Sequence, residues 1–229
     1  MPTIPLIEQL TRGSVPPGSN ILVEYDPASQ WYNASVTIAA GWLGTGGGVS
    51  YSAWAQSPES IRARLRRLGI KTEEFEANDR LRIWDGYTLT LGRKSVEKLH
   101  FKSVKVADLS IGFLSSPGRY VDRIRVVDDW STYARFNEDK NWVEFMLARA
   151  IPAGPLWQST AIAGLMNGVH SEWIYRRLEG ACDAVIDFKL REEGKAATNI
   201  LRIRSMKDQH FDPEWHSIRV AENFQITLE

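Results

Sequence analysis

The alternation of strands and helices before residue 181 limits the fold more than any other feature of this sequence. Runs with the apolar pattern of strands are separated by segments whose apolar residues recur at helical spacing. The strands are predicted at 21–24, 49–54, 80–85, 122–130 and 159–167. The helices are predicted at 4–10, 31–42, 57–68, 106–114, 142–150 and 171–180. Strands that alternate with helices in this way pair in parallel, and the helices cover the sheet.

The sequence from Cys182 onward has a different pattern. "CDAVIDFKLREEGKAATNILRIRSMKD" is predicted to form two strands joined at Glu193-Gly194, and "SIRVAENFQITLE" two more. We therefore expect a three-layer α/β fold whose mainly parallel central sheet is extended by an antiparallel meander at about 182–229. No internal repeat or long linker divides the chain, so residues 1–229 are predicted to form a single domain.

Charge and cysteine content restrict the cellular role. The 229 residues include 28 basic and 28 acidic side chains, so no bulk field draws the chain to nucleic acid or an anionic membrane. Cys182 is the only cysteine, which excludes an intrachain disulfide and fits a reducing compartment. No signal-peptide pattern opens the sequence and no apolar run has the length of a membrane span. We expect a cytoplasmic protein.

Four stretches, in this order along the chain, carry a family resemblance. They are "IPLIEQLTRGSVPPGSNILVEYDP", "VSYSAWAQSPESIRARLRRLGI", "RIRVVDDWSTYARF" and "RRLEGACDAVIDFKLREEGKAATNILRIRSMKD". They resemble, respectively, the entry into the nucleotide loop, the second strand and its helix, the Walker B strand, and the closing strand and hairpin of the KaiC-like branch of the RecA superfamily of ATPases. The resemblance covers nearly the whole chain and implies a RecA-like fold.

The phosphate loop of that family follows the pattern G-x-x-x-x-G-K-[ST]. Its glycines let backbone N–H groups surround the phosphates, its lysine neutralises them and its hydroxyl holds magnesium. Here the pattern starts at Tyr25, and Gln30, Trp31 and Tyr32 occupy the positions of the second glycine, the lysine and the hydroxyl residue. Charge-assisted hydrogen bonds contribute about 1.5–3 kcal/mol each, so these replacements predict that ordinary ATP binding is lost. The alternative is that this strand, turn and helix never formed a phosphate loop. It also predicts that ATP does not bind here.

The other catalytic positions that the resemblance assigns are also altered. Ala55 and Gln56 stand where the family has two glutamates that activate water, and neither can act as a general base. Ser205 and Lys207 stand where the family sends basic residues into the neighbouring subunit's nucleotide. Asp128 matches the Walker B aspartate, but without a phosphate or a loop hydroxyl it has no complete magnesium site to join.

Because the losses fall on catalytic positions, we expect a catalytically inactive KaiC-like protein with no cofactor and no metal. It would act as an oligomerising or partner-binding subunit in signal transduction. The expected partner is a second copy, in a ring or a dimer, or an active KaiC-like or signalling protein. Two alternatives stay open. One is a DNA-binding paralogue that uses the basic run Arg62–Lys71, although the balanced charge makes nucleic acid the weaker choice. The other is a cleft reused for a different small molecule, stacked on Trp31 or Tyr32.

Three further residue types are interpreted from the sequence. The four histidines have no metal-ligand spacing, and Cys182 beside Ala181 and Ala184 is typical of a buried small residue. Tryptophan is enriched at protein interfaces, and several of the nine tryptophans fall in regions that the resemblance places at the nucleotide cleft or the subunit contact. These are Trp31, Trp42, Trp54, Trp130, Trp157 and Trp215.

Overall fold

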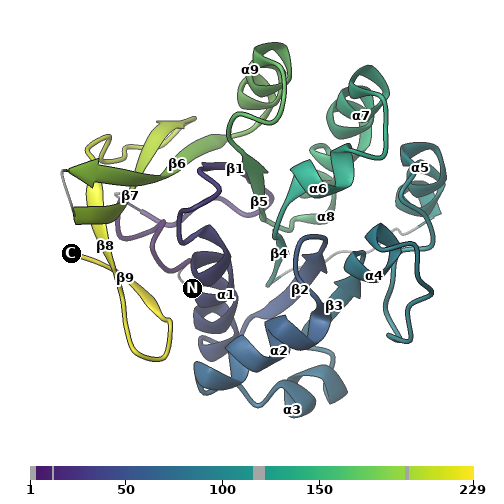
Figure 1. Cartoon of the computed structure of the whole chain (residues 1–229), viewed down its shortest axis with the longest axis horizontal. Helices are drawn as coiled ribbons and strands as arrows, with labels where there is room; N and C mark the ends of the chain where they lie inside the picture. The colour runs from purple at the N-terminus through teal and green to yellow at the C-terminus, as the bar shows by residue number, and fades with distance from the viewer. Residues whose placement is uncertain (1–3, 12, 116–121, 194–195) are drawn as a thin grey trace.

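The computed structural model describes residues 4–11, 13–115, 122–193 and 196–229 (Figure 1). Within them, the strands form one sheet in the order β3-β2-β4-β5-β1-β6-β7-β8-β9. The strands from β3 to β6 in this order run parallel, and β6 to β9 pair antiparallel. The predicted mainly parallel sheet with an antiparallel extension is confirmed.

The strand boundaries agree with the apolar runs in the sequence to within a few residues. The six parallel strands are β1 (Asn20–Tyr25), β2 (Gly48–Ala53), β3 (Leu81–Asp85), β4 (Arg123–Val127), β5 (Ala161–Met166) and β6 (Ala184–Glu193). The antiparallel additions are β7 (Ala196–Met206), β8 (His216–Val220) and β9 (Ile226–Leu228). The predicted joint at Glu193-Gly194 falls partly outside the described residues, because the description stops at residue 193 and resumes at 196.

Helices cover both faces of the sheet, as Figure 1 shows. One face carries α1 (Trp31–Gly44), α2 (Pro58–Arg67) and α3 (Thr72–Ala77), together with the chain near the N-terminus. After the short α4 (Tyr87–Thr90), the other face carries α5 (Val106–Ser115), α6 (Trp130–Ala134), α7 (Asp139–Phe145), the π-helical turn η1 (Met146–Ala150), α8 (Ala153–Trp157) and α9 (Glu172–Ala181). The side chains of β1 alternate between the two cores, since Ile21 and Val23 face α1 while Leu22 faces α6 to α9.

Two predicted helices are wrong or incomplete. Residues 4–10 form turns, because the carboxylate of Glu8 accepts hydrogen bonds from the N–H groups of Ile4 at 2.8 Å and Val15 at 2.7 Å and so holds the segment folded back. The helix predicted at 142–150 begins earlier, at Asp139, and continues from Met146 as a π-helical turn. The helix predicted at 57–68 is confirmed as α2, and Ser57 caps its N-terminus, since Ser57 Oγ accepts a hydrogen bond from Ser60 N at 3.2 Å.

Candidate functional site

The loop between β1 and α1, residues 26–30, lies at the carboxyl end of the parallel sheet, where α/β proteins bind ligands. Three of its backbone N–H groups are already bonded to other protein groups. Asp26 N donates to Phe188 O at 2.9 Å, Ser29 N to Asp26 O at 2.9 Å and Gln30 N to Asn199 Oδ1 at 3.1 Å. None of residues 25–32, all of which the structure describes, has a positive φ angle. The loop therefore lacks the alternating conformation that builds an anion-binding nest.

Trp31, which the sequence resemblance matches to the phosphate-loop lysine, is buried beneath this loop. Its indole Nε1 donates a 2.7 Å hydrogen bond to the backbone oxygen of Asp128, and its ring packs edge-on against Phe188 with a centroid distance of 6.1 Å. Gly164 in β5 makes the space for the ring, because a Cβ at this position would come within 2.2 Å of Trp31 Nε1. The indole thus links α1 to the end of β4 and has no polar atom left for a ligand.

Tyr25 and Tyr32 close the space beside Trp31. Their hydroxyls lie 2.9 Å apart in a hydrogen bond, and their rings meet edge to face at 5.6 Å. Burial raises the pKa of both phenols, so both are neutral at physiological pH. Gln30, at the second glycine position, bonds to Asn33 through its side chain (2.6 Å). The four replaced positions therefore contact one another and neighbouring parts of the fold.

The carboxylate of Asp128 is fully buried and is occupied by backbone donors. Oδ1 accepts hydrogen bonds from Trp54 N at 2.7 Å and Asp129 N at 2.8 Å, and Oδ2 accepts from Ala55 N and Gln56 N, each at 3.1 Å. Burial raises the pKa of Asp128, and the N–H groups of Trp54, Ala55 and Gln56 oppose this shift because they stabilise the charged carboxylate. All four donors come from protein backbone, so Asp128 fastens the end of β2 to the end of β4.

Ala55 and Gln56 lie beside Asp128, as expected for positions at the end of β2. Their backbone N–H groups bind its carboxylate, and the side chain of Gln56 is 8% exposed. Neither polar atom of the Gln56 amide has a partner within the described residues. The structure therefore brings together Tyr25, Gln30, Trp31, Tyr32 and the end of β2.

Ser205 and Lys207 lie away from these residues in the same chain. Ser205 pairs with Val185 near the start of β6, and Lys207 Nζ donates to Gly180 O at 3.0 Å. The amino ends of the parallel strands lie at the opposite end of the sheet from the carboxyl ends of β1 and β4. The contact of Ser205 and Lys207 with a neighbouring subunit's site stays a prediction.

The basic run Arg62–Lys71 is largely neutralised by acidic neighbours. Its ion pairs join Arg62 with Glu76 and Glu97, Arg66 with Glu59 and Glu73, and Lys71 with Glu74. Arg67 lies over the ring of Phe224, with the guanidinium carbon 5.3 Å from the ring centroid. A run in which three of the five cations already have carboxylate partners is a poor match to a phosphate backbone.

Other residues singled out in the sequence have mainly structural surroundings. Trp31, Trp54 and Trp130 are buried in the cores, so these three side chains are not available on the surface for a partner, whereas Trp42, Trp157 and Trp215 are partly exposed. Cys182 is buried, which raises the pKa of its thiol to about 12. In the described part of the chain, no three His, Cys, Asp or Glu side chains are grouped to hold a metal ion. None of the helices described has both the length and the apolar character required to cross a membrane.

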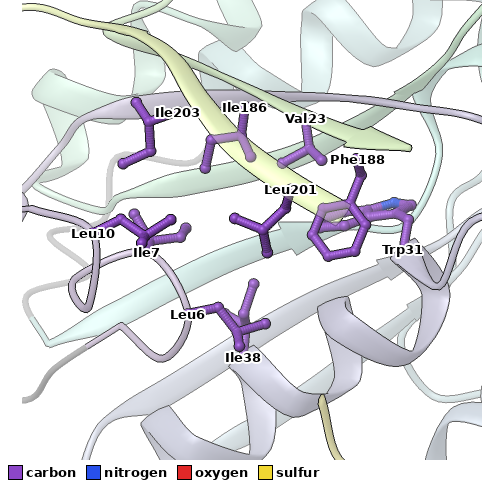
Figure 2. Close-up of a pocket in the computed structure, with 10 residues that line it drawn as sticks. All are labelled: Leu6, Ile7, Leu10, Val23, Trp31, Ile38, Ile186, Phe188, Leu201 and Ile203. Atoms are coloured by element: carbon purple, nitrogen blue, oxygen red, sulfur yellow. The ribbon is translucent and has the colours of Figure 1, made fainter. Parts of the chain in front are cut away.

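A small apolar cavity of about 10 Å³ lies on the α1 side of the sheet, between the N-terminal turns and the strands β1, β6 and β7. Figure 2 shows Trp31 and Phe188 at one end of it and Leu10 at the other. Its walls are entirely apolar, and a cavity of this size holds no more than about one water molecule. It is therefore a packing defect rather than a ligand site.

Comparisons with known proteins support the fold and give no closer identification. No family model matches the sequence, and no curated protein matches it. Among solved structures, the KaiC-like protein PH0186 from the hyperthermophilic archaeon Pyrococcus horikoshii OT3 superposes with a TM-score of 0.75. The match covers 100% of this chain and 97% of that protein, at 16% sequence identity. The chain therefore has a KaiC-like fold of the RecA type.

The sequence did not indicate the structural roles of Gly164 and Asp128 at this site. Gly164 was included in a predicted strand without any role, although an isolated glycine inside a strand signals close approach of another group. Asp128 was interpreted through its resemblance to a magnesium-binding residue. Its four backbone donors come from residues 54–56 and 129, and that arrangement depends on the pairing of β2 with β4.

Proposed function

We propose that this chain is a non-hydrolysing KaiC-like protein that acts by binding a partner or a second copy of itself. The observation that carries the proposal is the indole of Trp31 at the position of the phosphate-loop lysine, with its Nε1 bonded to Asp128 O at 2.7 Å. A lysine at this position would supply a charged donor to a phosphate. The tryptophan supplies none, and it fills the volume instead.

The surroundings of Asp128 give separate support. A magnesium ion needs carboxylate oxygens that face the site, usually with several water molecules. The oxygens of Asp128 face four backbone N–H groups and are buried. With Ala55 and Gln56 in place of acidic residues, the site also lacks a general base for the attack of water. The degenerate phosphate loop and the lost glutamates thus each predict that ATP is not hydrolysed.

Two large apolar side chains near α9 support a role in protein association. Val169 is 53% exposed and Trp173 is 47% exposed, and they are four residues apart in the chain. Exposed tryptophan is typical of interfaces rather than of free surface. We therefore propose that this protein is a regulatory subunit, whether it assembles with itself or with an active relative.

The nucleotide proposal is tested by calorimetric titration of the purified protein with MgATP and MgADP, alongside a phosphate-release assay. We expect no binding heat and no phosphate release above background. An active KaiC-like ATPase measured in parallel shows that both assays detect the activity. Hydrolysis that disappears in Asp128→Asn, with the variant still folded by circular dichroism, would refute the proposal. Light scattering after gel filtration, on the parent and on Trp173→Ser, measures self-association separately.

A further inference from the structure

The segment between α4 and α5 is strongly basic although the whole chain is neutral. Residues 91–105, here called the basic segment, carry five exposed lysine and arginine side chains and one acidic residue. The cations are Arg93, Lys94, Lys98, Lys102 and Lys105. The single acid, Glu97, is already bound by both terminal nitrogens of Arg62 at 2.7 Å. Within the described residues, none of the five cations forms an ion pair. The basic segment thus keeps its positive charge.

The basic segment is held in one conformation by buried polar contacts. Asp85, at the end of β3, accepts hydrogen bonds from Ser95 Oγ at 2.5 Å and Thr88 N at 2.9 Å. Its backbone bonds to Leu99 O and to Phe101 N, each at 3.0 Å. Together with the Arg62–Glu97 pair, these contacts fix both arms of the loop. A surface that is already ordered loses less conformational entropy when a partner binds.

A surface groove of about 540 Å³ continues from the end of the basic segment. It lies between the start of α5 and the turn from α6 to α7, and Lys105, Arg135 and Asn141 are among its lining residues. Lys105 Nζ donates to Phe136 O at 2.7 Å, which fixes the segment to this turn. Arg135 Nη2 reaches Thr90 O at 3.5 Å, just before the basic segment, and Lys105 belongs to both the segment and the groove, so the two share one surface.

This surface is apolar as well as cationic. Val96 is 100% exposed and Leu91 is 50% exposed, between and beside the cations. The groove adds Val106, Ala107 and Phe136 to its lining, and also the carboxylate of Glu138. A phosphate backbone offers no apolar group to Val96 or to the groove, and a flat lipid surface cannot enter a groove. An acidic peptide with apolar side chains satisfies the cations, the exposed Val96 and the apolar groove lining together.

We propose that the basic segment and the adjoining groove form a docking site for an acidic, apolar-containing peptide segment of a partner protein. This inference rests on the proposed function, because it names the partner chemistry of a regulatory subunit. The cations of the basic segment attract the carboxylates, and the groove takes the apolar side chains. Figure 1 places α4 and α5 at the opposite side of the molecule from β8 and β9, so the C-terminal meander stays free for other contacts.

The test is fluorescence anisotropy on the full-length protein with a short fluorescein-labelled peptide in which Asp and Glu alternate with Leu and Phe. Lys94→Glu combined with Lys98→Glu should weaken binding about tenfold or more, because two attractive charges become repulsive. Arg219→Glu reverses an exposed cation on β8 and should change the affinity by less than about twofold. Equal affinities for the double variant and the Arg219 control would overturn the proposal.

A second variant separates apolar contact from charge. Val96→Ser leaves the charge unchanged and should weaken peptide binding by about threefold to tenfold at both low and physiological salt. Tighter binding of a labelled DNA duplex, or of phosphatidylserine vesicles, than of the peptide would also overturn the proposal. The phosphate-release assay keeps the two proposals apart. If the protein binds the peptide and also hydrolyses ATP, only the non-hydrolysing role is refuted. If it neither binds the peptide nor hydrolyses ATP, only the docking site is refuted.

Discussion

Asp128→Asn distinguishes a structural aspartate from a metal-binding one. Asparagine keeps one oxygen, which can still accept hydrogen bonds from Trp54 N and Asp129 N. Its amide nitrogen would face Ala55 N and Gln56 N, which then have no acceptor. A buried donor left without a partner costs about 1–3 kcal/mol, so the two donors predict a loss of about 2–4 kcal/mol after local relaxation.

Reversible urea unfolding followed by circular dichroism measures this loss as a lower midpoint with an unchanged slope. In a thermal scan, a loss of 2–4 kcal/mol corresponds to a fall in Tm of about 4–16 °C for a chain of this size. Ser131→Ala is a nearby control, because it removes only one hydrogen bond, from Met166 N to Ser131 Oγ at 2.9 Å. A loss below about 0.5 kcal/mol in Asp128→Asn would refute the structural role and reopen the metal-binding interpretation.

Two further changes test the packing and the electrostatics of β1 and β5. Gly164→Ala should destabilise the protein by about 1–3 kcal/mol in the same urea assay, because the new methyl group meets the indole of Trp31. Gly180→Ala is the control, because nothing lies within 4 Å of the added Cβ, and it should be neutral or stabilising by about 0.5–1 kcal/mol. A similar loss of stability in both variants would contradict the packing argument. Burial raises the pKa of Glu24 to about 7, although Arg204 lowers it, so the folded protein holds a proton that the unfolded chain releases near 4.5. The stability from this proton is present below about pH 4.5 and is lost as the pH rises through 7. Glu24→Gln carries no titrating group here, so its stability relative to the parent should increase over this pH range. Parallel stability profiles of the two proteins against pH would contradict the assignment.

Much of the fold could be predicted from local patterns. The apolar runs at β1, β4 and β5 and the cap at Ser57 involve residues that are close in sequence, so their periodicity is visible without a structure. The N-terminal segment was mispredicted because its conformation depends on the Glu8 side chain, which bonds to Val15 seven residues away. Periodicity cannot show that a side chain replaces helical backbone bonds.

The candidate site was predicted in part. The replacement of the loop lysine by Trp31 is visible in one sequence once the pattern is matched to the first strand. The sequence does not show where the indole goes, because its partners, Asp128 O and Gly164, are far away along the chain. The sequence also does not show which tryptophans are buried and which are exposed, since burial depends on which strands and helices meet.

The sequence by itself determined the order of strands and helices and the absence of phosphate-binding residue types from the loop after the first strand. These properties depend on residue type and short-range spacing. Only the tertiary structure decided that Trp31 fills the space beside β5, that Asp128 binds the backbone just after β2 and that Arg135 reaches the end of α4. Each of these contacts joins residues separated by at least 45 positions in the chain, and local propensity carries no information about such contacts.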